Sequence, residues 1–270
     1  MAEILNGGTR PAPMDLKELP SRAFARHPWE SVRADFFLRL LRERTASRAL
    51  SALDVGAGDG YFAERLLAGC PTVARLTCFD VAYNDTWLQG KVASDPRLTF
   101  TAQRPEDRYD LVLMLDVLEH MEDDRATLRE AASSFLKPGG WLLLSVPAGK
   151  LLFSHHDELL GHKRRYAPSN LRSLAGDAGL AVIDHGELFA SLLVPRAMGK
   201  LGEVALGKDC SRAPSPVSHI ETPLGTWNHG KIITSMVNTA LSLDARCCRF
   251  ASRLRLPFAG LSTWVLAQSR

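Results

Sequence analysis

The chain has 270 residues, of which 46% are hydrophobic, and a formal net charge of +3 at pH 7. A chain of this length and composition can bury one large core, or one core with a smaller lobe. Because Lys and Arg are spread along the sequence rather than clustered among aromatic residues, we expect no nucleic-acid partner.

The hydrophobic runs and the cysteine content indicate the cellular compartment of the protein. No apolar run approaches the roughly 18 to 20 residues that cross a bilayer. The five cysteines, at positions 70, 78, 210, 247 and 248, have no zinc-ligand spacing, and their odd number favours reduced thiols. We therefore expect a cytoplasmic protein.

The predicted elements begin after an N-terminal arm. Residues 1–27 are rich in Gly, Pro and charged residues, which is typical of a mobile arm. A helix is predicted from Trp29, because Val32, Phe36 and Leu40 recur at four-residue spacing. Further along the chain, strands are predicted at 50–55, 74–80, 97–102, 109–116, 140–147 and 180–187, and helices at 60–68, 84–92, 123–136 and 168–178. This alternation predicts an α/β fold, a parallel sheet with helices on both faces.

The regular alternation stops after the sixth strand. Residues 190–258 contain two predicted helical segments joined by a Pro- and Ser-rich connector at 211–216, and a last strand is predicted at 260–267. Since the sixth strand ends at the ligand-binding edge of such a sheet, we predict that this insertion is a lid and substrate-recognition lobe. The core is then formed by 28–189 and 259–270.

The predicted helix at 231–253 within the insertion is amphipathic. Ile233, Val237, Leu241 and Cys248 share one side, and several arginines lie near its end. Such a stripe commonly packs on its own domain, but a basic amphipathic helix can also lie on an anionic membrane. Peripheral membrane contact is therefore the second alternative for this helix.

The segment 54–60 connects the first predicted strand to a helix through three alternate glycines. Glycines allow positive φ angles and let a ligand approach the backbone closely, so this turn predicts a nucleotide-like cofactor. An NAD pyrophosphate fingerprint would need its third glycine at the position of Tyr61, which makes an NAD(P)-dependent oxidoreductase the weaker alternative. Twenty residues after Gly60 comes Asp80, where a carboxylate can accept both ribose hydroxyls.

The pattern D-x-G-x-G-x-G at 54–60 resembles motif I of the class I S-adenosylmethionine-dependent methyltransferases. This resemblance implies a Rossmann-like, doubly wound sheet of seven strands whose last strand is antiparallel, here with a helical insertion between the sixth and seventh strands. It also implies S-adenosylmethionine as the cofactor and S-adenosylhomocysteine as the product. The implied cofactor-binding residues are Asp54, Gly56, Ala57, Gly58, Tyr61, Asp80, Val81, Gln103, Leu115 and Asp116.

A second motif lies at 109–120. It resembles the fourth strand and following loop of small-molecule methyltransferases, similar to the ubiquinone-biosynthesis enzymes, in which the strand end lies beside the methionine part of the cofactor. That places Leu115 and Asp116 near the cofactor, although Asp116 could also cap a helix and His120 could be a packed, hydrogen-bonded histidine. The usual acid of the adenine site is missing near Gln103, which leaves open a non-catalytic cofactor-binding or scaffold protein.

A third motif follows the fifth predicted strand, at 145–148, 153–158 and 161–166. It resembles a segment of bacterial methyltransferases from polysaccharide, lipid and secondary-metabolite clusters. Histidines, an aspartate and cations there can supply a general base and an anion clamp. The candidate substrate residues are His120, His155, Asp157, Arg164, Arg165 and Tyr166, with Trp29 on the N-terminal helix as a second wall.

Two other interpretations of this loop stay open. Arg165 and Tyr166 could dock the next helix onto the sheet, through pairs with acidic residues. The spacing of His155, His156, Asp157 and His162 would permit a zinc site. Methyl transfer from a sulfonium needs no Lewis acid, so no metal is expected.

The predicted reaction is an SN2 methyl transfer to an oxygen, less favourably a nitrogen or carbon, of a small-molecule, secondary-metabolite or lipid- or sugar-linked acceptor. The protein would align donor and acceptor, exclude water and remove a proton from a hydroxyl. The candidate bases are, in order, His162, His156 and Asp116. Monomer and homodimer are both compatible with the sequence.

Overall fold

The computed structural model describes residues 26–45, 49–91, 93, 95–205 and 227–270. The predicted connector at 211–216 lies outside these residues, as does the predicted arm apart from positions 26 and 27. The strands are β1 (Leu50–Val55), β2 (Val73–Phe79), β3 (Leu98–Thr101), β4 (Tyr109–Leu115), β5 (Leu136–Pro147), β6 (Leu180–Leu188) and β7 (Ser262–Ser269). The α-helices are α2 (Pro28–Thr45), α3 (Tyr61–Gly69), α4 (Asp85–Gly90), α5 (Asp124–Phe135), α6 (His155–Leu159), α7 (Pro168–Asp177), α8 (Leu193–Ala205) and α9 (Gly230–Arg253).

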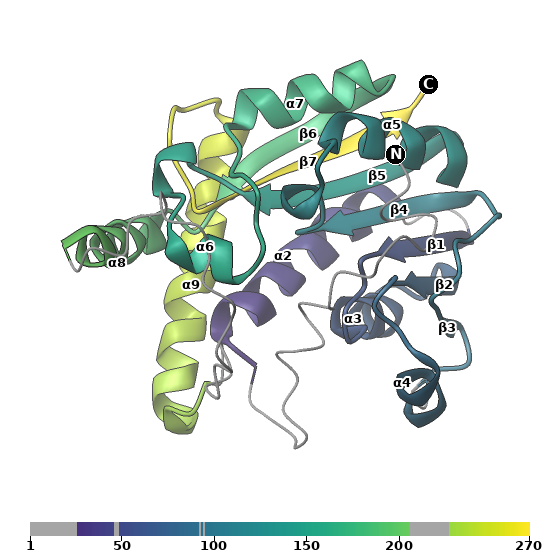
Figure 1. Ribbon diagram of the computed structural model, residues 1–270, viewed down its shortest axis with the longest axis horizontal. Coiled ribbons are helices and arrows are strands. Elements are labelled where there is room, and N and C mark those ends of the chain that lie inside the picture. Colours follow the sequence, from purple (N-terminus) through teal and green to yellow (C-terminus); the bar gives the residue numbers. More distant parts are fainter. Residues whose placement is uncertain (1–25, 46–48, 92, 94, 206–226) are drawn as a thin grey trace.

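Within the described residues, seven strands form one sheet in the order β3-β2-β1-β4-β5-β7-β6 (Figure 1). β1 to β5 pair in parallel, and β7 pairs antiparallel with both β5 and β6. The predicted seven-stranded, doubly wound fold with an antiparallel last strand is therefore confirmed.

Two apolar layers hold helices against the two faces of the sheet. α2, α3 and α9 pack on one face, and α5 and α7 pack on the other (Figure 1). The period of two in a strand divides β1 between these layers, since Ala52 faces the first layer and Leu53 and Val55 face the second. The carboxyl ends of β1, β4 and β5 consequently meet at one edge of a sheet that is covered on both sides.

The predicted boundaries differ most at the start of β5. The helix predicted to 136 ends at Phe135, and β5 begins at Leu136, four residues before the predicted position. Leu136 pairs with Tyr109, and regular pairing resumes at Trp141 with Leu111 after a register shift. The Pro and Gly residues at 138–140, which are typical of a helix end, lie inside this irregular part of the strand.

The inner side of α9 packs on its own domain. Leu241 and Cys248 are buried, and Val237 packs against the core beside α2 and β6. Three of the four residues of the predicted stripe thus pack on the domain, whereas Ile233 is 51% exposed. Among the described residues, no helix is both long enough and apolar enough to span a membrane.

Phe37 on α2 should be one of the main contributors to stability. Its side chain has no exposed surface and makes edge-to-face contacts with Phe36, Phe62 and Trp264, at centroid distances of 5.5, 6.4 and 6.4 Å. Phe37→Ala should lower the free energy of unfolding by about 3 to 5 kcal/mol, because it leaves a cavity under the sheet. Urea titration followed by circular dichroism measures this change.

The matched control is Leu151→Ala, at a residue that is 87% exposed. This change should alter the free energy of unfolding by less than about 0.5 kcal/mol. Equal effects of the two substitutions would contradict the packing described for α2.

Candidate active site

A cavity of about 410 Å³ opens at the carboxyl-terminal edge of the sheet. It is lined by residues from α2, the turn between β1 and α3, the end of β4, the loop after β5 and the start of α8. Ligands of open α/β sheets bind at this edge. The two strongest sequence motifs, the glycine turn and the loop after β4, therefore face one space.

The glycine turn adopts a conformation that requires glycine. Gly56, Gly58 and Gly60 have φ angles of 68°, 55° and 81°, in the region that other residues rarely adopt. A Cβ on Gly60 would lie 2.7 Å from the Phe100 ring, and one on Gly56 would lie 2.8 Å from the Val117 side chain. The turn is held close to its supporting side chains, and its other side lines the cavity.

Asp80, at the end of β2, holds the turn from behind. Its carboxylate accepts hydrogen bonds from the backbone amides of Gly58, at 3.0 Å, and Ala82, at 2.9 Å. Burial raises the pKa of Asp80 although both amides oppose the shift. Asp80 is therefore adjacent to the glycine turn, but it does not line the cavity itself.

Asp54 is a buried carboxyl group that does line the cavity. Burial, and then the nearby charge of Asp80, raise the pKa of Asp54 to about 8. A buried carboxyl with such a pKa gains a favourable partner when a cation enters the cavity. This end of the cavity is suited to a ligand with positive charge.

The end of β4 contacts the N-terminal helix across the cavity. Asp116 has a φ of 57°, and its backbone amide donates to the Ser145 carbonyl at 2.8 Å. The Asp116 carboxylate forms an ion pair with Arg33 of α2, whose guanidinium lies 4.6 Å from the centre of the Trp29 ring. A left-handed residue other than glycine is strained, and such residues cluster at functional sites.

Asp157 is the centre of the polar network behind the opposite wall. Its side chain has no exposed surface and accepts hydrogen bonds from His162 Nδ1 at 3.0 Å, Arg165 Nε at 2.8 Å, and Arg196 of α8. Burial alone would raise the pKa of Asp157, but the His162 hydrogen bond and the two arginine charges outweigh it and hold the pKa at about 2. The network fixes His162, Arg165 and Arg196 at the cavity wall.

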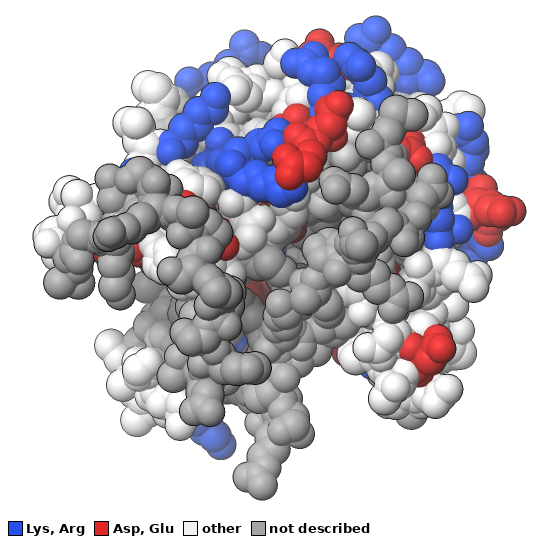
Figure 2. All heavy atoms as spheres, in the orientation of Figure 1, with Lys and Arg blue, Asp and Glu red and all other residues white. Residues whose placement is uncertain are grey.

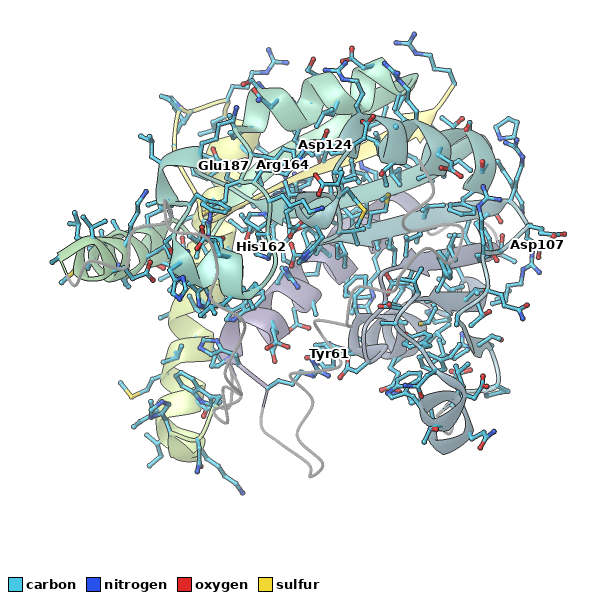
Figure 3. The ribbon with its side chains drawn as sticks, viewed as in Figure 1. Tyr61, Asp107, Asp124, His162, Arg164 and Glu187 are labelled. Atoms are coloured by element: carbon cyan, nitrogen blue, oxygen red, sulfur yellow. The ribbon has the colours of Figure 1, made fainter. Side chains whose placement is uncertain are left out.

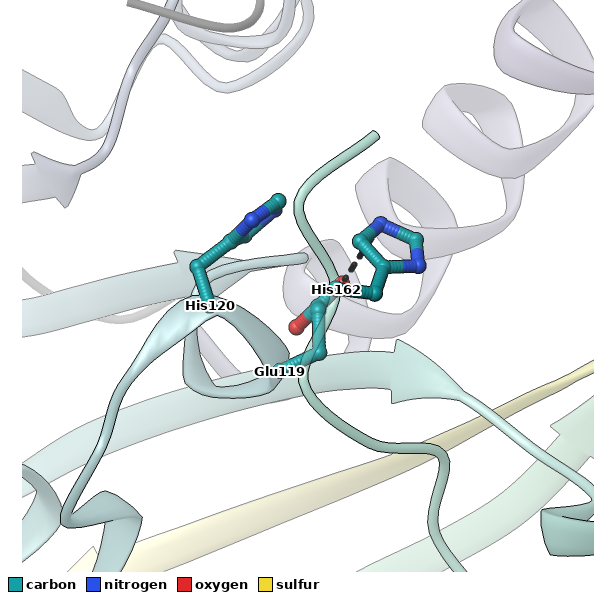
Figure 4. A group of neighbouring side chains, drawn as sticks. All are labelled: Glu119, His120 and His162. Carbon is teal, nitrogen blue, oxygen red and sulfur yellow. Dashed lines mark ion pairs between the residues drawn. The ribbon is translucent and has the colours of Figure 1, made fainter. Parts of the chain in front are cut away.

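His162 lies beside Glu119 and His120, as Figure 4 shows. Its Nε2 is 4.0 Å from Glu119 Oε1, and the His120 ring is 4.9 Å away between centroids. His120 Nδ1 is 3.3 Å from the Gly161 carbonyl oxygen, and burial, followed by the charge of His162, lowers the pKa of His120 to about 4. His120 is therefore neutral at pH 7.

In the part of the chain that the structure describes, Glu119, His120 and His162 are also close enough to hold a metal ion, with ligand atoms within 4.8 Å of one another. This set differs from the one that the sequence spacing suggested. The His155 amide donates to Glu203 and its ring pairs with Glu158, so His155 is not brought to the cavity.

The structure brings most of the predicted site residues together at the cavity. Those that line it are Trp29, Asp54, Gly56, Ala57, Gly58, Tyr61, Leu115, Asp116, His120, His156, His162 and Arg165.

The other predicted residues lie elsewhere. Val81 packs against the core, and Gln103 is exposed after β3. Arg164 pairs with Asp124 at 3.1 Å, and the Tyr166 hydroxyl donates to the same carboxylate at 2.8 Å. Arg164 and Asp124 are labelled in Figure 3. Arg164 and Tyr166 therefore join the loop after β5 to α5, away from the cavity.

Several lining residues were missed by sequence reasoning, among them the charged residues Arg33, Glu119 and Arg196. Arg33 follows Trp29 by four residues, a spacing that puts both on one side of a helix and could have identified it. Glu119 lies inside the motif at 109–120 but was not singled out. Arg196 belongs to the insertion, where no motif indicates a function.

Comparison with known proteins places these features in a family. A family profile described as a methyltransferase domain matches residues 22–185. A ubiquinone biosynthesis O-methyltransferase of Leptothrix cholodnii is 28% identical over 150 residues, which cover 49% of this chain and 63% of that protein. The enzyme of the same name from Serratia proteamaculans is 30% identical over 146 residues, covering 45% and 58%. The matched region thus spans less than two thirds of these relatives.

Solved structures share the fold at low sequence identity. Coclaurine N-methyltransferase, bound to N-methylheliamine and S-adenosylhomocysteine, superposes with a TM-score of 0.52 at 14% identity, covering 97% of this chain and 80% of that one. The [4+2]-cyclase SpnF superposes with a TM-score of 0.50 at 18% identity, covering 93% and 84%. These likenesses establish the fold alone.

Asp157 provides a test of the polar network. Asp157→Asn would leave Arg165 and Arg196 buried without their counter-charge and should lower the free energy of unfolding at pH 7 by about 3 to 5 kcal/mol. The folded-state pKa of Asp157 is below the unfolded value near 3.9, so its contribution is present above that value and is lost as the pH falls towards about 2. Denaturant titrations of both proteins at pH 7, 5 and 3 measure the difference.

The control is Glu158→Gln, one residue along the same helix, where the carboxylate pairs only with His155 in the described structure. It should cost less than about 1 kcal/mol. A gap between wild type and Asp157→Asn that stays constant in acid would contradict the assigned role.

Proposed function

The chain belongs to the methyltransferase domain family, within the class I S-adenosylmethionine-dependent superfamily, and from that premise we propose that it transfers a methyl group to a small-molecule or lipid- or sugar-linked acceptor. The observation that carries this proposal is the shared cavity. The glycine turn and the buried carboxyl of Asp54 lie at one end, and His162 with its buried partner Asp157 lies at the other.

The donor end is compatible with S-adenosylmethionine. This cofactor, when bound, supplies a methyl group already activated on a sulfonium. The residues that would hold it are Gly56, Gly58, Asp54 and Leu115, which line the cavity. Asp80, predicted to bind the ribose, instead supports the turn through the Gly58 amide. The cationic amino-acid part of the cofactor would favour the ionised form of Asp54, whose pKa is raised in its absence.

The acceptor end is compatible with general base catalysis on a hydroxyl. An ionised carboxylate only accepts hydrogen bonds, so His162 Nδ1 carries the proton that it shares with Asp157. Nε2 is then the ring nitrogen that can take a proton from an acceptor. An oxygen acceptor is favoured over nitrogen or carbon because the matched curated relatives are O-methyltransferases.

Two other residues are weaker candidates for the base. His156 also lines the cavity. Burial, followed by the charge of Arg196, lowers the pKa of His156, which makes its ring a weaker proton acceptor. The Asp116 carboxylate is already engaged in an ion pair with Arg33. We therefore assign the base to His162 first.

The insertion at 190–258 is proposed to cover the acceptor. Its first part contributes Leu192 and Arg196 to the cavity wall, and Arg196 is tied to Asp157. α9 packs instead along α2 and contributes no lining residue among those described. In this proposal α8 and the short segment before it form the lid, and α9 is its support.

Incubation with methyl-labelled S-adenosylmethionine and a metabolite extract tests the proposed function. A labelled small molecule whose formation depends on the protein is the expected result. Cofactor binding without a labelled product from any extract would favour the scaffold alternative, and binding of a nicotinamide dinucleotide instead would favour an oxidoreductase.

Asp54 should couple cofactor binding to a proton. Asp54→Asn should weaken S-adenosylhomocysteine binding by about tenfold or more, since one charged hydrogen bond is lost. With wild type, affinity should rise as the pH increases towards about 8, because the neutral acid must lose its proton before it can pair with the ligand. Calorimetry in two buffers of different ionisation enthalpy measures the proton release.

Asp59→Asn is the matched control, because Asp59 also lines the cavity but pairs with Arg26. Affinity for S-adenosylhomocysteine should change less than about threefold in this variant. Binding with no proton released in wild type would argue against ionisation of Asp54 by the cofactor.

His162→Asn should separate catalysis from cofactor binding. Without the base, turnover should fall by on the order of 100-fold or more, while affinity for S-adenosylhomocysteine stays within about threefold. His185→Asn, on the edge strand β6, is the control and should leave turnover unchanged. Unaltered turnover in His162→Asn would refute its role as the base, and lost cofactor affinity would move His162 to the donor site.

A further inference from the structure

The described part of the insertion carries most of the large exposed apolar side chains. Of the fourteen large hydrophobic residues that are exposed in the described structure, all but Leu151, Leu159 and Ile183 lie in the insertion. Monomeric soluble proteins rarely expose contiguous apolar surfaces of this kind, and they commonly mark interaction sites. These residues belong mainly to α8 and α9.

α8 has the opposite orientation to an ordinary surface helix. Its polar side faces the protein, where Arg196 binds Asp157 and Ser154, Lys200 donates to the Leu151 carbonyl, and Glu203 accepts from the His155 amide. Its apolar side faces outward, with Val194, Met198 and Leu201 65%, 66% and 68% exposed. Packing on the core therefore does not explain the apolar side of α8.

α9 has a second apolar side. Leu241 and Cys248 face the core, whereas Ile232, Met236, Leu243 and Phe250 fall within about 40° of one another on the other side of the helix. Those four residues are 78%, 67%, 62% and 63% exposed. We call the outward sides of α8 and α9, defined by Met198, Leu201, Ile232, Met236, Leu243 and Phe250, the insertion surface.

Cations outnumber carboxylates in the described part of the insertion, although Arg196, Arg249 and Arg253 are already paired with Asp157, Asp184 and Glu43. The described part of the insertion has seven Lys and Arg residues and two acidic residues, Glu203 and Asp244. Both carboxylates are engaged within the protein, Glu203 with the His155 amide and Asp244 with Ser191. Lys231 and Arg246 are exposed and have no carboxylate of the described structure within ion-pair distance.

Basic residues around an apolar helix side match the chemistry of an anionic bilayer surface. Apolar side chains gain by entering the boundary of the acyl chains, and each cation near the lipid headgroups adds about fivefold in affinity. An uncharged apolar partner would leave the charges of Lys231 and Arg246 without a counter-charge. We propose that the insertion surface docks the protein peripherally on an anionic membrane.

The position of the surface fits this role. α8 and α9 both extend beyond the carboxyl-terminal edge of the sheet, where the cavity opens (Figure 1). In Figure 2 the visible parts of α8 and α9 carry mostly uncharged side chains, whereas Lys, Arg, Asp and Glu gather over α7 and α5. Docking in this way would bring the acceptor end of the cavity near the lipid. The inference goes beyond the proposed function and does not depend on methyl transfer.

Vesicle flotation with the full chain tests the proposal without any cofactor or acceptor. Wild type should float with vesicles of phosphatidylglycerol and phosphatidylcholine in equal parts, should bind pure phosphatidylcholine more weakly, and should be released by salt. Met236→Glu with Leu243→Glu should lower the partition coefficient by about tenfold or more, and so should Met198→Glu with Leu201→Glu. Lys231→Ala with Arg246→Ala should reduce the preference for the anionic vesicles.

The matched control is Ile183→Glu, at an exposed apolar residue of β6 outside the insertion, which should float as wild type does. Unchanged thermal unfolding and S-adenosylhomocysteine binding would establish that the charged variants are folded. Wild type that stays with the unbound protein, or α8 and α9 variants that float as well as wild type, would overturn the proposal. A lipid-free dimer that the same substitutions dissociate would overturn it too, in favour of self-association.

Discussion

The candidate active site depends on one buried carboxylate, that of Asp157. Its side chain is inaccessible to solvent, and it accepts hydrogen bonds from three side chains that line the cavity, His162, Arg165 and Arg196. A buried charge is tolerated only when it is paired and hydrogen-bonded. The need to pair Asp157 therefore fixes the positions of these three side chains. The position of the proposed base, and of the helix that covers it, therefore follows from the need to satisfy one charge.

The donor side depends on a different constraint. The glycine turn is compressed between the cavity and the side chains of Phe100 and Val117, so no Cβ can be added at Gly60 or Gly56 without displacing them. Asp80 fixes the turn through the Gly58 amide. The backbone is thus preorganised towards the cavity, and a cofactor would bind with little cost of ordering. The proposed donor and acceptor sides are built by different elements and meet at the end of β4.

Strain and charge at that meeting point support a functional role. Asp116 adopts a left-handed conformation and is held by the Ser145 carbonyl and by Arg33. Through Arg33 and Trp29, α2 closes the cavity from the side that the sheet leaves open. The two helical additions to the core, α2 and α8, thus each supply a cavity-lining arginine that pairs with an aspartate of the core, Arg33 with Asp116 and Arg196 with Asp157.

Local signals explain how much of this could be predicted from sequence. Strand and helix periodicity, together with the glycine turn, were sufficient for the order of elements and for the sheet edge that holds the site. The start of β5 was misplaced because Pro138 and the glycines after it resemble a helix end, whereas pairing with Tyr109 begins earlier. The ion pairs Arg33–Asp116 and Arg196–Asp157 join residues far apart in the chain, and no local pattern indicates them. The outward apolar side of α8 was equally hidden, since its amphipathic pattern alone does not show which side meets the core.

The central claim is that one cavity joins a donor site at the glycine turn to an acceptor site at His162. A crystal structure of the protein with S-adenosylhomocysteine would test this claim most directly. We expect density for S-adenosylhomocysteine along the glycine turn and in contact with Asp54. Its sulfur atom should be directed towards Asp116 and the His162 side of the cavity. Density elsewhere, or no binding at this turn, would contradict it.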